Sequence, residues 1–491
     1  MLIHNRFRVA LVLLILLLGT AVADAQTAGS DGLGDPYFPT LGNGGYDAQH
    51  YDINIDVDVQ DQQFTATSIM SAKATQDLSA FNLDFTAAEL DSAEVNGQPA
   101  QAARSGDELT LTPAASLKNG DTFKVVTSYK GVTQARSDQE TFAALGWLPT
   151  SSGLAVLGEP AGSSSWFPVN EHPLDKATYT MHISVAKPLI AVSNGDLKSV
   201  VDNPKNASES TYTWEMDQPM ASYLAVLAVG SFTREDARSP GGITIRNYFP
   251  TAYADDAEGA FKDQGDMLDY FSSLFGSYPF DAYGALVLDT NLGFSLESQS
   301  MTTFTPFVME AVLDDNPMRG EGTIAHEMTH QWFGDSVSLT SWKDIWLNEG
   351  FATYGSWLWF EHSQGKPTYN SIVRSAYEDV SGKQYKQQGL STDEIRQKLL
   401  QFAVTGDPTP DKLFDYPGVY ERGALTLHAL RLTIGDAAFF NTLKTYQQKY
   451  KYGNATTADF IAVAQQASGK DLADFFQHWL YDPIIPALPQ G

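Results

Sequence analysis

The pattern of apolar residues changes once along this chain, and that change limits the folds open to it. Over residues 46–232, apolar and polar residues alternate in short runs separated by turn signals such as Asn-Gly at residues 96–97. A period of two with such turns is typical of half-buried antiparallel strands. After a Ser-Pro-Gly-Gly break at residues 239–242 and a few more strands, apolar residues recur at three-and-four spacing, which indicates helices. We therefore expect a β-domain at residues 46–240 and a mainly helical domain at residues 241–491.

Composition excludes several classes of site and partner. The 491 residues contain no cysteine, which excludes disulfides, iron–sulfur clusters and thiol catalysis. A metal ion would therefore be bound by histidine and carboxylate side chains. The 59 acidic residues outnumber the 31 lysines and arginines and give a formal net charge of -28. Because a phosphate backbone favours a basic face, we expect no nucleic-acid partner and no attraction to anionic membranes.

The first 25 residues have the pattern of a secretory signal peptide. Arg6 and Arg8 precede an apolar run at residues 9–18, and small residues follow up to Ala25, as in a signal sequence and its cleavage site. A membrane anchor is the alternative, but the run is shorter than the ~20 apolar residues of a spanning helix. We expect a secreted protein, extracellular or periplasmic, with no stable membrane insertion and with a linker at residues 26–45.

A histidine pair in the second half of the chain indicates metal chemistry. His326-Glu327-x-x-His330 lies within a helical pattern, so both imidazoles face the same side of the helix and can reach one metal ion. Glu327 follows the first histidine by about 100° around the helix, which directs it to the open side of the metal, where it can take a proton from water. The alternative is a pair of surface histidines on an amphipathic helix.

A third ligand is needed, because catalytic zinc takes three protein ligands and keeps one position for water. Glu349 lies at the start of a second helical stretch, and 18 residues separate it from His330. An acidic residue near a helix start is common, and alone it would be a weak sign. Together with the histidine pair, it predicts one Zn²⁺ ion per chain, bound by His326, His330 and Glu349.

The H-E-x-x-H motif followed by 18 residues and a glutamate resembles the zinc aminopeptidases of the aminopeptidase N type, a family that includes leukotriene A4 hydrolase. The resemblance extends from about Tyr46 to Pro483. It implies a saddle-like, antiparallel N-terminal β-domain and a thermolysin-like, mainly helical catalytic domain. Many family members continue into a further helical domain that covers the active site. Because this sequence ends at Gly491, we expect two domains and an open cleft.

The same resemblance implies three further site residues. Residues 293–298 are similar to the family's G-x-M-E-N strand, with Leu and Ser in place of Met and Asn, and they match Glu297 to the glutamate that binds the free amine of the substrate. Glu159, shortly before Trp-Phe-Pro at residues 166–168, matches a second amine-binding acid; an ordinary acid in a Gly/Ser-rich turn is the alternative. Tyr420 matches a tyrosine that donates a hydrogen bond to the developing oxyanion. The alternative is a packing role, which is the usual one for a lone tyrosine near the start of a helix.

These residues predict a secreted zinc aminopeptidase that removes single residues from peptides with a free N-terminus, with Glu327 as general base. A zinc endopeptidase or an epoxide hydrolase of the same family would share the metal site, and only the amine-binding acids argue against them. A non-catalytic peptide-binding relative would need a broken ligand set, which this sequence does not have. A binding module with an incidental metal site would leave Glu327 and Tyr420 unexplained. No feature indicates an obligate protein partner.

Overall fold

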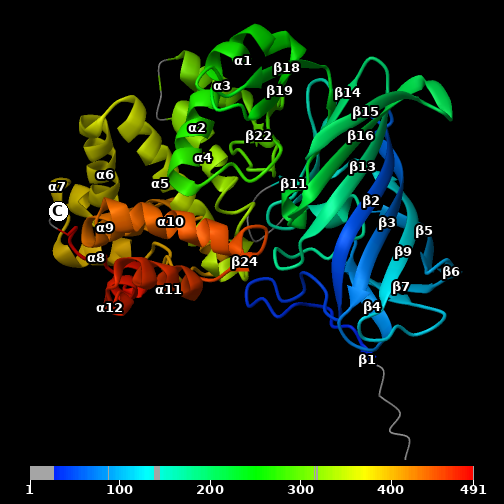
Figure 1. Ribbon diagram of the computed structural model, residues 1–491, viewed down its shortest axis with the longest axis horizontal. Helices are drawn as coiled ribbons and strands as arrows, with labels where there is room; N and C mark the ends of the chain where they lie inside the picture. The colour runs from blue at the N-terminus through cyan, green and yellow to red at the C-terminus, as the bar shows by residue number, and fades with distance from the viewer. Residues whose placement is uncertain (1–26, 87, 138–143, 315, 317–318, 490–491) are drawn as a thin grey trace, which may run out of the picture.

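The computed structural model describes residues 27–489, apart from residues 87, 138–143, 315 and 317–318. The expected signal peptide, residues 1–25, lies outside the described residues, so export of the chain stays a prediction. The chain forms a β-rich half and a helical half that lie side by side (Figure 1). Among the described helices, none combines the length and the apolar character needed to cross a bilayer.

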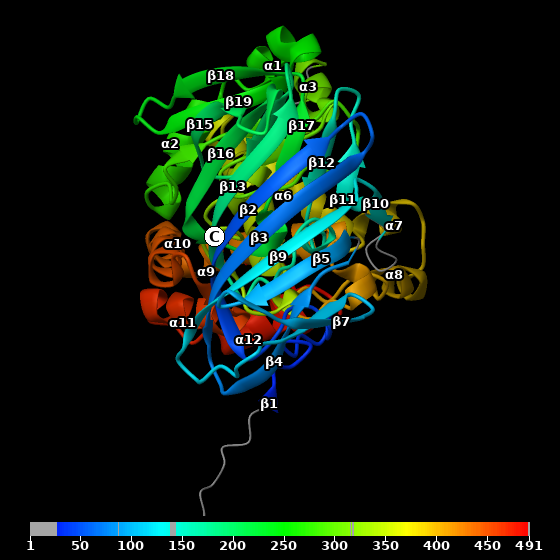
Figure 2. The same cartoon turned by 90° about the vertical axis from the view of Figure 1, so that its right-hand side faces the viewer.

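An eight-stranded sheet forms one face of the molecule, with the helices behind it (Figure 2). Its strands are β2 (Tyr46–Asp58), β3 (Gln63–Ala74), β5 (Ala88–Val95), β6 (Gln98–Pro99), β9 (Thr122–Val132), β13 (Ala177–Ala186), β15 (Asp196–Asn203) and β16 (Asn206–Met220). Their order is β15-β16-β13-β2-β3-β9-β5-β6. In β2, Ile53, Ile55 and Val57 are buried while the polar residues between them are at least partly exposed, which is the predicted period of two.

One pair of strands in this sheet departs from the expected antiparallel arrangement. β13 runs parallel to β2, whereas β2 pairs antiparallel with β3. Parallel neighbours need a long connection, and 118 residues lie between the end of β2 and the start of β13. Alternation of apolar residues is the same in either strand direction, so the sequence pattern could not reveal this parallel pair.

Two smaller sheets complete the β-rich half. One contains β10 (Ala135–Ser137), β11 (Ala144–Pro149), β12 (Leu154–Leu157), β14 (Ile190–Ser193) and β17 (Leu227–Gly230). The other contains β1 (Thr27–Ala28), β4 (Leu78–Asp84), β7 (Gln101–Ser105) and β8 (Glu108–Thr112). β12 is buried along its whole length, and the chain passes from its end directly into the loop that contains Glu159.

The break at residues 239–242 connects two strands of one hairpin. These strands are β18 (Phe232–Arg238) and β19 (Thr244–Pro250), and they pair antiparallel. The same sheet continues into β20 (Ala282–Tyr283), β21 (Ala285–Val287) and β22 (Thr302–Phe304). β18 therefore shares a sheet with the strands that follow the break.

The stretch before Tyr46, expected as a linker, is packed onto both halves. A carboxylate oxygen of Asp35 lies 3.3 Å from His172 Nε2 of the β-rich half. The same oxygen accepts hydrogen bonds from Ser341 Oγ (2.8 Å) and Trp342 N (2.9 Å) of the helical half. Burial alone would raise the pKa of Asp35, but its hydrogen bonds lower the pKa below the usual value. A charged carboxylate thus joins the two halves.

The helical half is built around a central helix that is buried along most of its length. The helices are α1 (Ala254–Ala260), α2 (Gln264–Phe275), α3 (Pro306–Leu313), α4 (Glu321–His330), α5 (Trp346–Ser363), α6 (Lys366–Val380), α7 (Lys383–Gln387), α8 (Thr392–Leu399), α9 (Arg422–Ile434), α10 (Asp436–Tyr450), α11 (Thr457–Ser468) and α12 (Ala473–Phe476). The central helix, α5, packs against both α4 and α9. A short parallel pair, β23 (Ser338–Leu339) and β24 (Asn454–Ala455), lies in the same half. The predicted order of a β-rich domain followed by a mainly helical domain is confirmed.

Candidate active site

Helices α4 and α5 bring the three predicted metal ligands together. His326 Nε2 lies 3.1 Å from His330 Nε2 and 3.2 Å from Glu349 Oε2, and His330 Nε2 lies 3.6 Å from the same oxygen. Ligand atoms at about 2.0–2.2 Å from one tetrahedral Zn²⁺ lie roughly 3.3 Å from one another. The observed spacings therefore fit zinc, and two imidazoles with one carboxylate form a known set of catalytic zinc ligands.

The second nitrogen of each imidazole faces the protein. His330 Nδ1 lies 3.1 Å from the carbonyl oxygen of Phe333, and His326 Nδ1 lies 3.4 Å from Thr353 Oγ1. When Nδ1 donates a hydrogen bond, Nε2 is left unprotonated and can bind a metal. These two contacts therefore orient both rings for binding through Nε2.

Two glycines of α5 let its neighbours come close. A Cβ at Gly355 would lie 2.1 Å from Thr329 Oγ1 on α4, and a Cβ at Gly350 would lie 2.8 Å from the Cα of Gly423 on α9. A larger residue at either position would push the helices apart. Because Gly350 directly follows Glu349, the close contact with α9 brings the segment around Tyr420 beside the ligands.

Glu327 lies on the same helix as the two histidines and is almost fully buried. One of its carboxylate oxygens, one of Glu297 and a ring nitrogen of His330 lie within 4.8 Å of one another. Burial raises the pKa of Glu327 well above its usual value; His330 opposes the rise, and the carboxylates of Glu297 and Glu349 add to it. A carboxylate with a raised pKa accepts a proton more readily, which suits a general base.

Glu297 and Glu159 reach the site from the two halves of the molecule. Glu297 precedes β22, Glu159 follows β12, and both border the cleft of the predicted ligands. The Oε1 atom of each is buried and has no hydrogen-bond partner among the described residues. Burial raises the pKa of both side chains, and repulsion from Glu297 raises the pKa of Glu159 further. Because a buried carboxylate oxygen without a partner is costly, a cationic ligand would stabilise this pair.

Tyr420 lies in η6 (Tyr416–Glu421), directly before α9. Its ring is nearly parallel to that of His326, with an interplanar angle of 11° and a centroid distance of 5.8 Å. Burial, followed by the nearby carboxylates of Glu349 and Glu159, raises the pKa of Tyr420 well above its usual value. The hydroxyl therefore keeps its proton and can donate a hydrogen bond.

One cleft of about 280 Å³ contains every site residue that the sequence predicted. They are Glu159, Glu297, His326, Glu327, His330, Glu349 and Tyr420. Sequence reasoning missed the aromatic residues Phe294, Trp357 and Tyr416, which also line this cleft. It also missed Asn194 and Gln331, which hydrogen-bond to the loop of Glu297. No pattern marks these residues, because their roles depend on contacts with distant parts of the chain.

Two family profiles together match most of the chain. The Peptidase M1 N-terminal domain matches residues 47–224, and the Peptidase family M1 domain matches residues 260–479. Aminopeptidase M1-B of Oryza sativa subsp. japonica is 27% identical over 337 residues, which cover 67% of this chain and 37% of that protein. Glutamyl aminopeptidase of Homo sapiens is 25% identical over 466 residues, 89% of this chain and 47% of that protein. The chain thus spans less than half the length of these two curated relatives.

Solved structures match over nearly the full length of both chains. An M1 zinc metallopeptidase from Deinococcus radiodurans has a TM-score of 0.80 and 27% identity, covering 94% of this chain and 99% of that chain. A two-domain M1 zinc metallopeptidase bound to L-tryptophan has a TM-score of 0.81 and 27% identity, covering 94% of this chain and 100% of that chain. Since both family profiles match in order and the whole architecture is shared, the chain belongs to the M1 family of peptidases.

Proposed function

We propose that this protein is a zinc aminopeptidase that removes single residues from peptides with a free N-terminus. The observation that carries the proposal is the pair of buried carboxylates, Glu297 and Glu159, that border the cleft of the metal ligands and lack a partner at Oε1. A protonated α-amine would pair with both carboxylates and place the first peptide bond at the metal. An internal segment of a peptide would leave both carboxylates buried without a counter-charge, which is costly.

His326, His330 and Glu349 would hold one Zn²⁺ ion per chain. Bound zinc polarises a substrate carbonyl and makes water in its open coordination position more acidic. The spacing of the three ligand atoms and the contacts of both Nδ1 atoms support this assignment.

Two side chains of the same cleft would act on the reacting atoms. Glu327 would take a proton from the attacking water and pass it to the leaving amine. Tyr420 would donate a hydrogen bond to the carbonyl oxygen as negative charge develops on it, a contact that is strongest in the transition state. The raised pKa of Glu327 and that of Tyr420 support these opposite roles of proton acceptor and hydrogen-bond donor.

The deciding experiment offers the zinc-loaded protein a peptide with a free N-terminus and its N-acetylated counterpart. We expect the free peptide to lose its first residue and the acetylated peptide to stay intact, because acetylation removes the charge that the two carboxylates would pair with. Mass spectrometry identifies the bond that is cut. A chelator should abolish cleavage, because the three ligand side chains then hold no metal.

Other outcomes would favour the alternative functions. Internal cleavage of the acetylated peptide would indicate a zinc endopeptidase and would mean that Glu297 and Glu159 are not amine anchors. Zinc binding without cleavage of either peptide would favour an epoxide hydrolase or a non-catalytic peptide-binding protein.

A cavity of about 210 Å³ shares Glu159, Phe294, Ser295 and Tyr420 with the cleft. Its other lining residues are apolar: Leu145, Leu157, Leu296 and Phe414. Among the described residues that line it, none is basic. Since an apolar cavity of roughly 150 Å³ can hold benzene, this one has room for an aromatic ring. We propose that it receives the first side chain of the substrate and favours aromatic and large aliphatic residues.

Peptides that begin with phenylalanine should be cleaved with a kcat/KM at least about a hundredfold above that of peptides that begin with glutamate. The reason is that a glutamate side chain would be buried in this cavity without a partner. The measurement compares peptides that differ only in their first residue. Comparable values for the two peptides would contradict the assignment.

A variant of the cavity wall tests its position. Phe414→Trp narrows the cavity and should lower kcat/KM for a peptide that begins with phenylalanine more than for one that begins with alanine. Phe440→Trp on α10 is the matched control, because Phe440 is also partly buried but does not line the cavity.

A further inference from the structure

The loop that carries Glu297 is tight and buried. Residues 297–301 join Leu296 to β22, and Leu296 and Thr303 exchange backbone hydrogen bonds of 2.9 and 2.7 Å across the base of the loop. Ser300 has a φ of 63°, in the left-handed region that residues with a side chain rarely adopt. Such a conformation persists only where the surroundings hold it. The position of Glu297 therefore depends on the contacts that hold this loop.

Gln331, the residue after the ligand His330, holds the loop from within the helical half. Its Nε2 donates a 2.9 Å hydrogen bond to the carbonyl oxygen of Glu297, and its Oε1 accepts a 2.8 Å hydrogen bond from Ser300 N. The side chain is fully buried. One amide group thus joins the loop of Glu297 to the end of the helix that carries two metal ligands.

Asn194 holds the same loop from the β-rich half. It lies in the turn between β14 and β15, and its Nδ2 donates hydrogen bonds to the carbonyl oxygens of Gln299 (2.8 Å) and Leu224 (2.9 Å). Its Oδ1 accepts a 2.8 Å hydrogen bond from Val226 N. The amide is therefore held by two bonds within the β-rich half and contacts the loop through the third.

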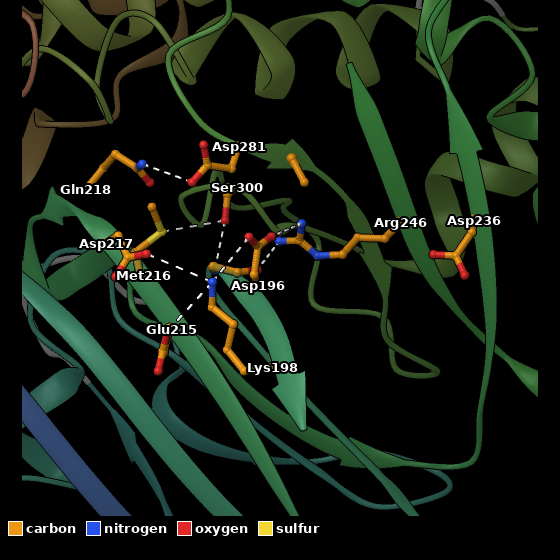
Figure 3. A network of polar contacts seen from close by, with 12 residues as sticks. Asp196, Lys198, Glu215, Met216, Asp217, Gln218, Asp236, Arg246, Asp281 and Ser300 are labelled. Atoms are coloured by element: carbon orange, nitrogen blue, oxygen red, sulfur yellow. Dashed lines mark hydrogen bonds and ion pairs between the residues drawn. The ribbon is translucent and has the colours of Figure 1, made fainter. Parts of the chain in front are cut away.

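The backbone beside Asn194 is also tied to the helical half. Gly195 N donates a 2.9 Å hydrogen bond to Ser300 Oγ, and a Cβ at Gly195 would lie 1.9 Å from the carbonyl oxygen of Glu215, so only glycine fits. Arg246 of β19 donates to the carbonyl oxygen of Gly195 and lies 3.3 Å from Asp196 Oδ1. Figure 3 shows Ser300, Asp196 and Arg246 within this one network. A shift of the turn would therefore shift Ser300 with it.

We propose that Asn194 and Gln331 are positioning residues that hold Glu297 in place to bind the α-amine of the substrate. The inference rests on the proposed function, because that function gives Glu297 its ligand. Glu297 Oε1 has no partner among the described residues and is left available for a ligand. Apart from a hydrogen bond with Tyr223, the place of the carboxylate depends on the loop backbone. A misplacement of about 1 Å at a site can cost about 10²-fold in rate. Recognition of a free N-terminus thus depends on the contact between the two halves.

The test is Asn194→Asp in the zinc-loaded full chain. Aspartate keeps the oxygen that accepts from Val226 N but loses both donated hydrogen bonds. Calorimetry compares the binding of L-phenylalanine with that of 3-phenylpropanoate, which has the same ring and carboxylate but no amine. We expect the dissociation constant of L-phenylalanine to rise about tenfold, the size of effect expected for the loss of one hydrogen bond. That of 3-phenylpropanoate should change by less than about twofold, because this ligand has no amine for Glu297 to bind.

Two further variants separate positioning from folding. Ser300→Gly removes the hydroxyl that Gly195 N contacts and frees the backbone without adding bulk, so it should act in the same direction. Gln218→Ala is the matched control, because it removes a 3.1 Å hydrogen bond to Asp281 between the same two halves without contacting the loop (Figure 3). The control should bind both ligands as the wild type does.

The outcomes distinguish the inference from the function on which it rests. Equal weakening of both ligands in Asn194→Asp and Ser300→Gly would indicate a structural role only and would overturn the inference, as would wild-type affinities in both variants. A wild-type protein that binds the two ligands equally well would overturn the amine-anchor role of Glu297 and the inference with it. A wild-type protein that discriminates between the ligands but cleaves no peptide would overturn the proposed activity alone.

Discussion

Replacing Glu327 with glutamine is expected to lower kcat by about 10²–10⁴-fold, the usual contribution of a general base. Glutamine has nearly the same size but cannot accept the proton of the attacking water. Because the three proposed ligand atoms belong to His326, His330 and Glu349, the zinc content should stay at the wild-type level. The measurement is kcat on a peptide with a free N-terminus, together with metal analysis of the same protein sample.

A second glutamate of the same helix provides the control for Glu327. Glu321 lies in the first turn of α4 and is not among the residues that line the cleft, so Glu321→Gln should retain the wild-type kcat. If Glu327→Gln kept more than about a tenth of the wild-type kcat with zinc bound, another group would have to accept the proton.

Replacing Glu297 with alanine is expected to lower kcat/KM for peptides with a free N-terminus by about a hundredfold. Truncating one partner of a buried charge pair costs about 2–5 kcal/mol, and the α-amine would be the partner here. The ratio of kcat/KM for free peptides to kcat/KM for acetylated peptides should fall as well. The Tm should change little, because burial raises the pKa of Glu297, and the cost of burying the ionised side chain offsets the packing and the Tyr223 hydrogen bond that the variant loses.

Two variants show whether the charge of Glu297 is what matters. Glu297→Gln keeps the shape of the side chain without its charge and should lose most of the same activity. Glu310→Ala, at an exposed position of α3, removes a carboxylate away from the cleft and should change nothing. A kcat/KM for Glu297→Ala within about threefold of wild type would rule out the amine-anchor role.

The two halves of the fold could be predicted because burial imposes a local period on each of them. Ile53, Ile55 and Val57 alternate with polar residues in β2, and such alternation needs no knowledge of the partner strand. The direction of β13 next to β2 does depend on the partner. The relative direction of the two strands is set by the long connection between them, and the residue pattern within one strand does not indicate that direction.

The grouping of the three proposed metal ligands could be predicted because a single helix carries most of their geometry. His326 and His330 are one turn apart, and this spacing by itself places both rings on one side. The roles proposed for Glu159 and Tyr420 came only from the resemblance, since the positions of these side chains depend on how distant segments pack. Asn194 and Gln331 act through hydrogen bonds to the loop of Glu297, and no residue type at a given spacing indicates such contacts.

Asp35 belongs to neither of the segments that the family profiles match. Its carboxylate nevertheless contacts His172 on one side and Ser341 and Trp342 on the other. A shortened chain that began at Tyr46 would keep both matched segments whole and still lose this shared contact. The contacts that hold the two halves together therefore include a residue outside both matched segments, and a chain cut to those segments would lack it.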